Sequence, residues 1–219
     1  MSIVVHHLEK SRSHRILWFL EEIGAEHEVC TYRRDRSFRA PAALRDVHPR
    51  GRAPVVVWDG RVLAESGAIL ETLAEALAPG LIPARDSDDF RHHRFFLHYA
   101  EGSLMSPLLV ALIMDKVAKA PVPLWGRLVG RGVRKAVNRS YTQPELDNHL
   151  RFLEDHLQRH AWFAGSSFGI ADIQMSYPLI AAAQRISVPF PTPAVNAWTH
   201  RVQGRDAFQR AVTTGGPLY

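Results

Sequence analysis

The sequence predicts a two-part molecule, an α/β domain followed by an all-helical domain. Strand and helix patterns alternate over residues 1–80, which is the order expected of a mixed sheet covered by helices. Residues 78–83 then bring two prolines and a glycine together, a composition typical of a linker. Beyond it, apolar residues recur at helical spacing. We therefore expect domains over residues 1–80 and 88–219, joined by a linker over residues 81–87.

The first domain is expected to begin with a strand, a helix and a second strand. Residues 3–7 form a short apolar strand, and the helix follows over residues 12–23, where the apolar side chains share one face. Gly24 ends that helix, because glycine readily adopts the left-handed conformation found after helix C-termini. The second strand is expected over residues 26–32. The polar, proline-containing stretch that follows has room for one short helix, over residues 42–46.

A hairpin and a helix complete the first domain. The runs 54–58 and 61–64 flank the turn Asp59–Gly60, and this arrangement is a strong β-hairpin signal. A helix is then expected over residues 66–78, with Ser66 as a favourable N-cap.

The second domain is expected to contain helices alone. Residues 86–119 form one long helix or a bent pair, because Pro107 interrupts the pattern. Residues 120–133 contain two prolines and three glycines, which predict a loop or a broken helix. Further helices are expected over residues 144–160, 169–185 and 193–204.

Composition is that of a globular protein with a full core. The 219 residues are 46% hydrophobic and 22% charged, and no apolar run approaches the length of a membrane-spanning helix. The first residues form a strand pattern and lack the features of a signal peptide. Cys30 is the single cysteine, so no internal disulfide can form, which suits a reducing compartment. We expect a cytoplasmic protein without a membrane span, with Cys30 as a small core residue.

The chain is basic, with a formal net charge of +5 at pH 7. Its arginines are scattered and accompany no nucleic-acid-binding motif, so we expect no nucleic-acid partner. Attraction of small anionic substrates is the simpler consequence of this charge. Arg127, Arg131, Arg134 and Lys135 form one basic group, for which a solvated face is the first interpretation and contact with anionic lipid or substrate is the alternative.

The most informative local pattern is a strand edge placed beside a helix start. Pro54 has no N–H and can only open its strand, which leaves the backbone groups of the extended Ala53 free. Glu65 and Ser66 place an acid and a hydroxyl at the positive end of the next helix. A free backbone edge can pair with a peptide, and a helix N-terminus can hold a carboxylate. The pattern therefore predicts a site for an amino-acid-like ligand.

Ser11 lies between the first strand and the first helix, where a side chain meets a ligand at the sheet edge. A hydroxyl at this place can donate a hydrogen bond to a thiolate, helped by the helix N-terminus. Lowering a thiol pKa from about 8.5 to about 6.5 requires a preference for the anion of about 2.7 kcal/mol. Ser13 competes for this role, and capping of the helix is the alternative role.

Other chemistries find little support in the sequence. No cysteine stands at position 11 or 14, so a Cys-x-x-Cys redox centre is excluded. Neither serine has the positioned histidine and carboxylate of an activated nucleophile, which argues against a hydrolase. The adjacent pairs His6–His7 and His92–His93 point their rings in different directions, so neither pair chelates a metal by itself. We therefore expect no metal site.

Together these patterns resemble the cytosolic glutathione S-transferase family, in particular its serine-type bacterial and fungal members. Residues 48–54, with the sequence HPRGRAP, are similar to the family's N-P-x-G-K-V-P segment. Pro54 matches its cis-proline, and Ala53 matches the residue whose backbone pairs with the cysteinyl unit of glutathione. Glu65 and Ser66 match the acid–serine pair that holds the γ-glutamyl group.

Three further positions carry the resemblance. Ser11 matches the serine that activates the thiol in serine-type classes. Arg52 stands where the family has a lysine, and the resemblance implies that it serves the glycine carboxylate of glutathione. Residues 163–173, FAGSSFGIADI, are similar to the family's helix-start motif, in which a cap residue and an Asp three positions later form a capping box. Gly169 holds the cap position in place of the usual Ser or Thr.

The resemblance implies a fold and a reaction. A thioredoxin-like N-terminal domain would bind glutathione, the co-substrate, and the helical domain would complete the site of a small apolar electrophile. The thiolate would attack that electrophile in a detoxification role, and Glu101 would reach a neighbouring subunit's glutathione in a homodimer. The helix at residues 95–114 and Phe38 would supply pocket walls. Two alternatives stay open, namely glutathione-dependent hydroperoxide reduction and a non-catalytic binding or regulatory protein of the same fold.

Overall fold

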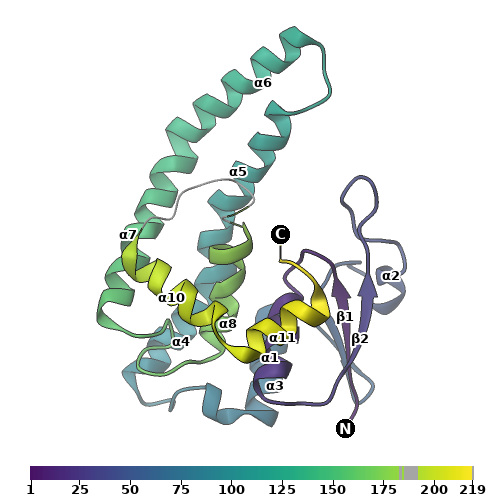
Figure 1. The fold of residues 1–219 in the computed structure, drawn as a ribbon, viewed down its shortest axis with the longest axis vertical. Coiled ribbons are helices and arrows are strands. Elements are labelled where there is room, and N and C mark those ends of the chain that lie inside the picture. Colours follow the sequence, from purple (N-terminus) through teal and green to yellow (C-terminus); the bar gives the residue numbers. More distant parts are fainter. Residues whose placement is uncertain (183, 185–191, 219) are drawn as a thin grey trace.

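The computed structural model describes residues 1–182, 184 and 192–218, and it has two parts (Figure 1). The chain begins in a thioredoxin-like part with a four-stranded sheet and passes into a larger part made of helices. The predicted fold class, α/β followed by all-α, is therefore confirmed.

The sheet has the strand order β2-β1-β3-β4. Its strands are β1 (Ile3–Leu8), β2 (Glu28–Tyr32), β3 (Val55–Trp58) and β4 (Arg61–Ala64). β2 runs parallel to β1, whereas β3 is antiparallel to both β1 and β4. The predicted hairpin is present, because Asp59 and Gly60 both adopt the positive φ that a tight two-residue turn needs, at 45° and 80°.

Three helices belong to the sheet part. They are α1 (His14–Glu22), the short α2 (Leu44–Val47) and α3 (Ser66–Leu77), close to the predicted positions. Every residue of α1 from His14 to Leu20 is buried, because α1 contacts β1 and α3 as well as α8 and α11 of the helical part. The first helix therefore joins the two parts of the molecule.

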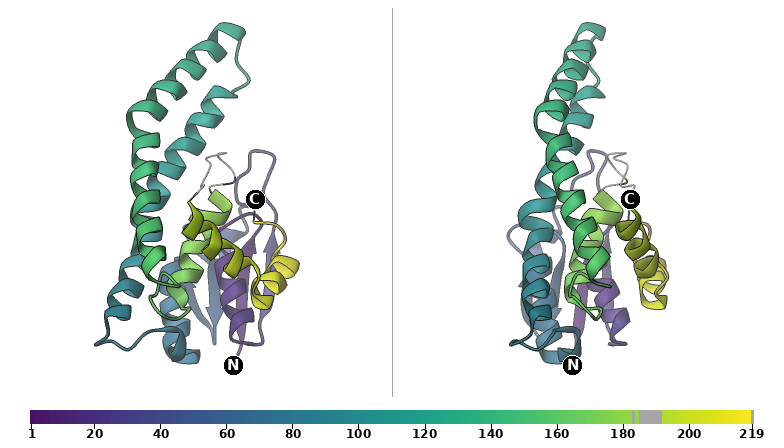
Figure 2. Two further views of the ribbon diagram at one scale, coloured as in Figure 1. Left: turned by 60° about the vertical axis from the view of Figure 1, so that its left-hand side comes forward. Right: turned by 90° about the vertical axis from the view of Figure 1, so that its left-hand side faces the viewer.

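The helical part is dominated by a long hairpin that projects beyond the sheet (Figures 1 and 2). Its helices are α4 (Asp88–Tyr99), α5 (Met105–Ala118), α6 (Leu124–Val137), α7 (Gln143–Arg159), α8 (Ile170–Ser176), α10 (Pro193–Gln203) and α11 (Asp206–Gly215). A 3-10 turn (Pro79–Leu81) precedes them, and π turns at Ala100–Leu104, Asn138–Thr142 and Tyr177–Ala182 interrupt their regular winding. The end of the helix predicted over residues 169–185 lies outside the described residues.

Pro107 does not break its helix. The proline lies in the first turn of α5, where a missing N–H is tolerated, and the π turn Ala100–Leu104 comes just before it. The predicted bend of residues 86–119 therefore takes the form of a π turn between α4 and α5.

α6 contradicts the loop or broken helix predicted for residues 120–133. One of its glycines instead lets the helix approach α5 closely. A Cβ on Gly130 would lie 3.0 Å from the carbonyl oxygen of Val117, so a larger residue would have to displace that backbone. Arg134 also pairs with Asp115 of α5 at 2.8 Å. Packing between two helices has overridden the low helix propensity of glycine.

α11 is a helix that local patterns did not predict. It returns from the helical part to lie along α1 of the sheet part, where Phe208 packs edge-on against Trp18. Arg205, just before α11, pairs with Glu22, which is 183 positions earlier in the sequence. α11 is therefore stabilised by its contact with the distant α1, and its own short apolar pattern is only a weak indication of a helix.

Half of the family's capping box is present at the start of α8, because Gly169 has no side chain to complete it. Asp172 accepts hydrogen bonds from the N–H groups of Gly169 at 3.1 Å and Phe163 at 2.8 Å. It also accepts from the Trp198 indole at 2.8 Å, which ties this turn to α10. A Cβ on Gly169 would lie 2.7 Å from the carbonyl oxygen of Leu81, which explains glycine in place of the usual Ser or Thr.

One run of described residues, Asp88–Ala118, is long enough to cross a membrane and contains an 18-residue window with a mean hydropathy of 1.4. Phe96, Leu97 and Leu104 of this run are buried in the core, and α4 packs against α8. Core helices of globular proteins meet the same criterion, so length and hydropathy do not assign a membrane span here.

Candidate functional site

A cavity of about 610 Å³ lies where the sheet part meets the helical hairpin. All the predicted site residues line it, namely Ser11, Arg52, Ala53, Pro54, Glu65 and Ser66. A second wall comes from α5, with Met105, Leu108 and Leu112. The cavity therefore has a polar half on the sheet part and an apolar half on the helical part.

Ala53 and Pro54 form the strand edge of the polar half, and the peptide bond between them is cis. The pairing of β3 with β1 and β4 begins at Val55, so Ala53 lies outside that ladder, as predicted. Arg52 lies exposed at the same edge. A backbone edge outside the ladder and beside a guanidinium suits a peptide that ends in a carboxylate.

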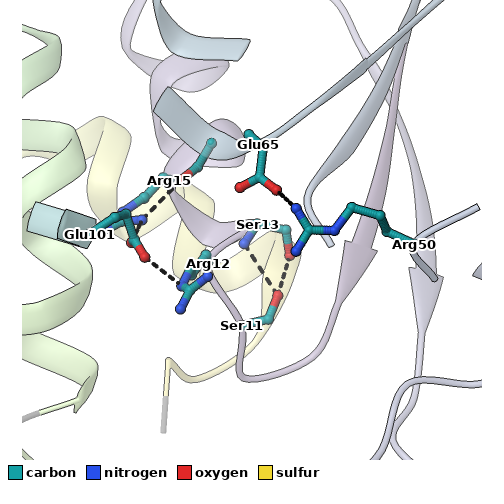
Figure 3. Close-up of polar contacts among 8 residues, drawn as sticks. Ser11, Arg12, Ser13, Arg15, Arg50, Glu65 and Glu101 are labelled. Carbon is teal, nitrogen blue, oxygen red and sulfur yellow. Dashed lines mark hydrogen bonds and ion pairs between the residues drawn. The ribbon is translucent and has the colours of Figure 1, made fainter. Parts of the chain in front are cut away.

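Glu65 and Ser66 form the helix end of the polar half. Ser66 is the first residue of α3 and not its N-cap, which corrects the prediction. Glu65 holds the cap position with a φ of 69°, a conformation that is uncommon for residues other than glycine and is often found at functional sites. The Glu65 carboxylate pairs with Arg50, which also lines the cavity (Figure 3).

Arg15 lies behind the cavity lining and contacts Ser66, a contact that the sequence did not predict. It is fully buried on α1, and one guanidinium nitrogen donates to the Ser66 hydroxyl at 3.0 Å and to the Glu101 carboxylate at 2.5 Å (Figure 3). Arg12 binds the other oxygen of Glu101 at 3.2 Å. An arginine among the apolar residues of α1 is the one sequence signal that could have pointed to this network.

Ser11 and Ser13 take different places. Ser11 lines the cavity, whereas Ser13 is fully buried behind it, with 2.7 Å between the two hydroxyl oxygens. Ser13 also contacts His7 Nδ1 at 2.9 Å and the carbonyl of Leu8 at 3.2 Å, and it accepts from the Leu8 N–H at 3.2 Å. His7 Nε2 in turn contacts the carbonyl of Gly215 at 2.9 Å.

Ser11 is not the N-cap of α1, although its side chain bonds the backbone just before the helix. Ser13 holds the N-cap position of α1, and its side chain makes no capping hydrogen bond. Ser11 Oγ accepts from the backbone N–H of Ser13 at 3.2 Å, just before the helix begins. Ser11 therefore presents a fixed hydroxyl to the cavity, close to the positive end of α1.

The loop that carries Phe38 borders the apolar half. Arg34 fixes this loop by donating to the carbonyls of Glu9, Lys10 and Phe38 at 3.1, 3.2 and 3.0 Å. Phe38 lines the cavity, as the resemblance implied, together with residues of α5. Phe95 is not among the lining residues and packs against Phe152, so the residues of the 95–114 range that line the cavity come from its later part, in α5.

The cavity is strongly cationic. Its described lining includes five basic side chains and a single acid, Glu65; the five are Arg12, Arg34, Arg50, Arg52 and Lys116. Such a field raises the local concentration of anionic ligands and favours the thiolate form of a bound thiol. The cavity can therefore attract small anionic ligands through its own lining residues.

The structure also places the cysteine and the paired histidines. Cys30 is exposed and not a core residue, because β2 is an edge strand and residue 30 faces outward from it. His7 and His93 are buried, whereas His92 lies beside His156 and His160. Among the described residues, no group of histidines, cysteines or carboxylates is arranged to hold a metal ion.

Comparisons with known proteins cover almost the whole chain. Residues 11–76 match the family model "Glutathione S-transferase, N-terminal domain", and residues 105–206 match "Glutathione S-transferase, C-terminal domain". Glutathione S-transferase 1 of Saccharomyces cerevisiae is 31% identical over 215 residues, which is 94% of this chain and 92% of the relative. Glutathione S-transferase 3 of Schizosaccharomyces pombe is 33% identical over 206 residues, 94% of this chain and 84% of the relative.

A solved structure gives the same result. The crystal structure of a glutathione S-transferase from Actinobacillus pleuropneumoniae superposes with a TM-score of 0.81 at 26% identity. The match covers 99% of this chain and 94% of that protein. The likeness therefore extends to both parts of the molecule.

Proposed function

Because the chain belongs to the glutathione S-transferase family, we propose that it joins the sulfur of glutathione to a small apolar electrophile. Glutathione, the family's co-substrate, occupies the polar half of the cavity. The observation that carries the proposal is Ser11, a buried hydroxyl that lines a cavity with both a peptide-binding edge and an apolar wall.

The polar half suits an extended glutathione. The free backbone of Ala53 pairs with the cysteinyl unit, and Arg52 holds the glycine carboxylate. Ser66 and the N-terminus of α3 hold the γ-glutamyl carboxylate, with the positive charge of buried Arg15 behind the Ser66 hydroxyl. Glu65 faces the ammonium group at the same end, where a carboxylate is the natural partner.

Ser11 acts on the sulfur. Its hydroxyl donates a hydrogen bond to the thiolate, and the N-terminus of α1 adds a favourable potential. A hydrogen bond to a charged group contributes about 1.5–3 kcal/mol, which is of the size needed to lower a thiol pKa by about two units. The thiolate is then present at neutral pH and is the nucleophile of the reaction.

The electrophile lies against Met105, Leu108 and Leu112 of α5 and against Phe38. The sulfur forms a new carbon–sulfur bond with its electron pair, and the leaving group departs with the pair that bound it. Contacts with this wall are apolar, so they hold a range of hydrophobic compounds and orient them by shape.

Family membership also supports a proposed oligomeric state and cellular location. We expect a homodimer in the cytoplasm, with detoxification of apolar electrophiles as its role. Within the chain, Glu101 is engaged by Arg12 and Arg15, so this proposal does not give it a part in a neighbouring subunit's site.

Steady-state kinetics of the wild type, Ser11→Ala and Ser13→Ala, at saturating glutathione with chlorodinitrobenzene and with cumene hydroperoxide, test this function. Ser11→Ala should lower kcat about 10- to 100-fold, because it removes one hydrogen bond to a charged group. Ser13→Ala should retain more activity but unfold more easily, since it leaves the Leu8 N–H and His7 Nδ1 without their hydroxyl partner.

Three results would contradict the proposal. Turnover of hydroperoxide alone would favour the reductive alternative, in which the same thiolate attacks a peroxide oxygen. Glutathione binding without turnover of either substrate would favour a non-catalytic protein. An unchanged kcat in Ser11→Ala, with a large loss in Ser13→Ala, would move the sulfur contact to Ser13.

A further inference from the structure

The positive charge of the chain is concentrated in the outer part of the helical hairpin. Residues 116–144 contain seven basic residues and no Asp or Glu. The whole chain carries +5, so the remaining residues together carry −2. The seven cations are Lys116, Lys119, Arg127, Arg131, Arg134, Lys135 and Arg139.

Large apolar side chains are exposed in the same segment. Leu124 and Trp125 are 75% and 72% exposed, and Leu128 and Val129 are 62% and 60% exposed. These positions recur at helical spacing, so they share one side of α6. Val122 and Val133 extend this surface, and we call the six residues the α6 face.

α6 meets α5 at Gly130 and through the ion pair of Arg134 with Asp115, and not through its most exposed apolar side chains. Gly130 is buried against the backbone of α5, and Gly126 is half-buried against Val122. The hydrophobic side chains of α6 therefore point to solvent and away from the core. A surface helix usually shows the opposite arrangement, with its apolar stripe turned inward.

The hairpin also carries this surface away from the rest of the molecule. Figures 1 and 2 show that the α5–α6 connection is the most distant point of the molecule from the sheet. A flat surface can therefore reach the α6 face without touching the sheet part.

We propose that the α6 face docks on an anionic lipid bilayer. Leu124, Trp125 and Leu128 enter the interfacial layer, while the neighbouring Arg127 and Arg131 contact lipid phosphates. Tryptophan is favoured at this depth because its ring is apolar and its N–H can stay in contact with polar groups. The exposed apolar side chains have cationic neighbours and no anionic ones in this segment. They therefore complement an anionic bilayer, whose headgroups are negative and whose interior is apolar.

This docking places the active site close to the membrane. Leu109, Leu112 and Lys116 of α5 line the cavity, and α6, which carries the α6 face, is the helix that follows α5 in the same hairpin. Apolar electrophiles concentrate in bilayers, so the enzyme would meet them where they accumulate. This consequence rests on the proposed function, whereas lipid binding itself requires neither Ser11 nor glutathione.

Flotation with vesicles of phosphatidylcholine containing about 30% phosphatidylglycerol tests the docking. We expect the wild type to float at low salt and to be largely released at high salt. Leu124→Ser/Trp125→Ser and Arg127→Glu/Arg131→Glu should each lower the bound fraction at least tenfold. Arg85→Glu/Arg91→Glu is the matched control, because it reverses two exposed arginines outside the hairpin and should still bind.

A second measurement guards against variants that fail to fold. Quenching of tryptophan fluorescence by brominated lipid chains should occur in the wild type and be lost in the conservative Trp125→Phe. Glutathione binding by calorimetry should be unchanged in every variant, so lost flotation with intact binding supports the lipid surface.

Several results would overturn the proposal. Equal loss of flotation in the Arg85/Arg91 control would assign binding to net charge alone. Tight binding to heparin that survives Leu124→Ser/Trp125→Ser, without vesicle binding, would assign the surface to a polyanion. A smaller particle mass in Leu124→Ser/Trp125→Ser, without vesicle binding by the wild type, would make the α6 face a contact between copies of this chain.

Discussion

At the residue scale, the direction of two hydroxyl protons decides what Ser11 can do. The carbonyl of Gly215 can only accept, so His7 must donate to it from Nε2. Burial lowers the pKa of His7, which favours the neutral ring and leaves Nδ1 to accept from the Ser13 hydroxyl. Ser13 therefore accepts at its 2.7 Å contact with Ser11. Ser11 is the donor of the pair, and a bound thiolate competes with Ser13 for that proton.

Arg15 gives a residue-scale prediction about glutathione binding. Arg15→Met removes the donor to the Ser66 hydroxyl and keeps the side chain apolar. We expect KM for glutathione to rise about tenfold with kcat little changed, since the loss of one charge-assisted hydrogen bond costs about 1.5 kcal/mol. Steady-state kinetics at varied glutathione concentrations measure both constants.

Glu101→Gln is the matched control for this prediction. It weakens the ion pairs of Glu101 but leaves the 3.0 Å hydrogen bond between Arg15 and Ser66 in place. The two variants should therefore differ in KM. Equal effects would show that the ion pair, and not the orientation of Ser66, governs glutathione affinity.

At the element scale, the hairpin depends on how closely α6 approaches α5. Gly130→Ala places a methyl group against the carbonyl of Val117, and we expect the free energy of unfolding to fall by about 1 kcal/mol. Gly132→Ala on the same helix meets no atom within 4 Å and should raise it by about 0.5–1 kcal/mol. Urea unfolding of both variants measures these changes. Stabilisation by both would mean that helix propensity outweighs packing in α6.

Local patterns predicted much of the fold and of the site. The hairpin turn Asp59–Gly60 and the strand-opening Pro54 depend on the conformations of single residues, which the sequence states directly. Ser11, Glu65 and Ser66 stand at element boundaries, and such boundaries can be located from short patterns. The structure brings these residues to one cavity, whereas their parts in catalysis stay predictions.

The features that were not predicted depend on contacts distant in sequence or on neighbouring elements. Arg15 is matched by Glu101, 86 positions later, so its burial on α1 is visible only in the fold. The glycines of α6 indicate a broken helix unless the close approach of α5 is known. Cys30 looked like a core residue because a strand pattern alone does not show which strand lies at the sheet edge.

At the scale of the whole molecule, α11 connects the end of the chain to α1 and so joins the two parts that form the cavity. His14 lies in this contact, edge-on to Phe208 with 5.2 Å between ring centroids. Both ring nitrogens of His14 are buried without a hydrogen-bond partner among the described residues. This contact therefore carries a buried titratable group that must stay neutral.

Burial lowers the pKa of His14 to about 3 from the ordinary value of 6.5. Between these two values the unfolded chain binds a proton that the folded protein does not. Keeping the buried His14 neutral therefore costs no stability above pH 6.5, and the free energy of unfolding falls progressively as the pH drops toward 3. Between about pH 7 and about pH 5, we expect the melting temperature of His14→Phe to fall by less than that of the wild type.

The exposed His98 provides the control for this pH dependence. His98→Gln removes an exposed histidine that lies outside the contact between α1 and α11, and so isolates the effect of burying His14. If His14→Phe follows the wild type, another group is responsible for the loss of stability in acid.

The most direct test of the central claim, that Ser11 holds the sulfur of glutathione as a thiolate, is a pH titration of the thiolate's ultraviolet absorbance. The background is Cys30→Ser, because Cys30 is the chain's only cysteine and is exposed. We expect bound glutathione to titrate near about pH 6.5, and near about pH 8.5 after Ser11→Ala, with binding retained in calorimetry. The same low pKa with and without Ser11, at equal glutathione occupancy, would contradict the claim.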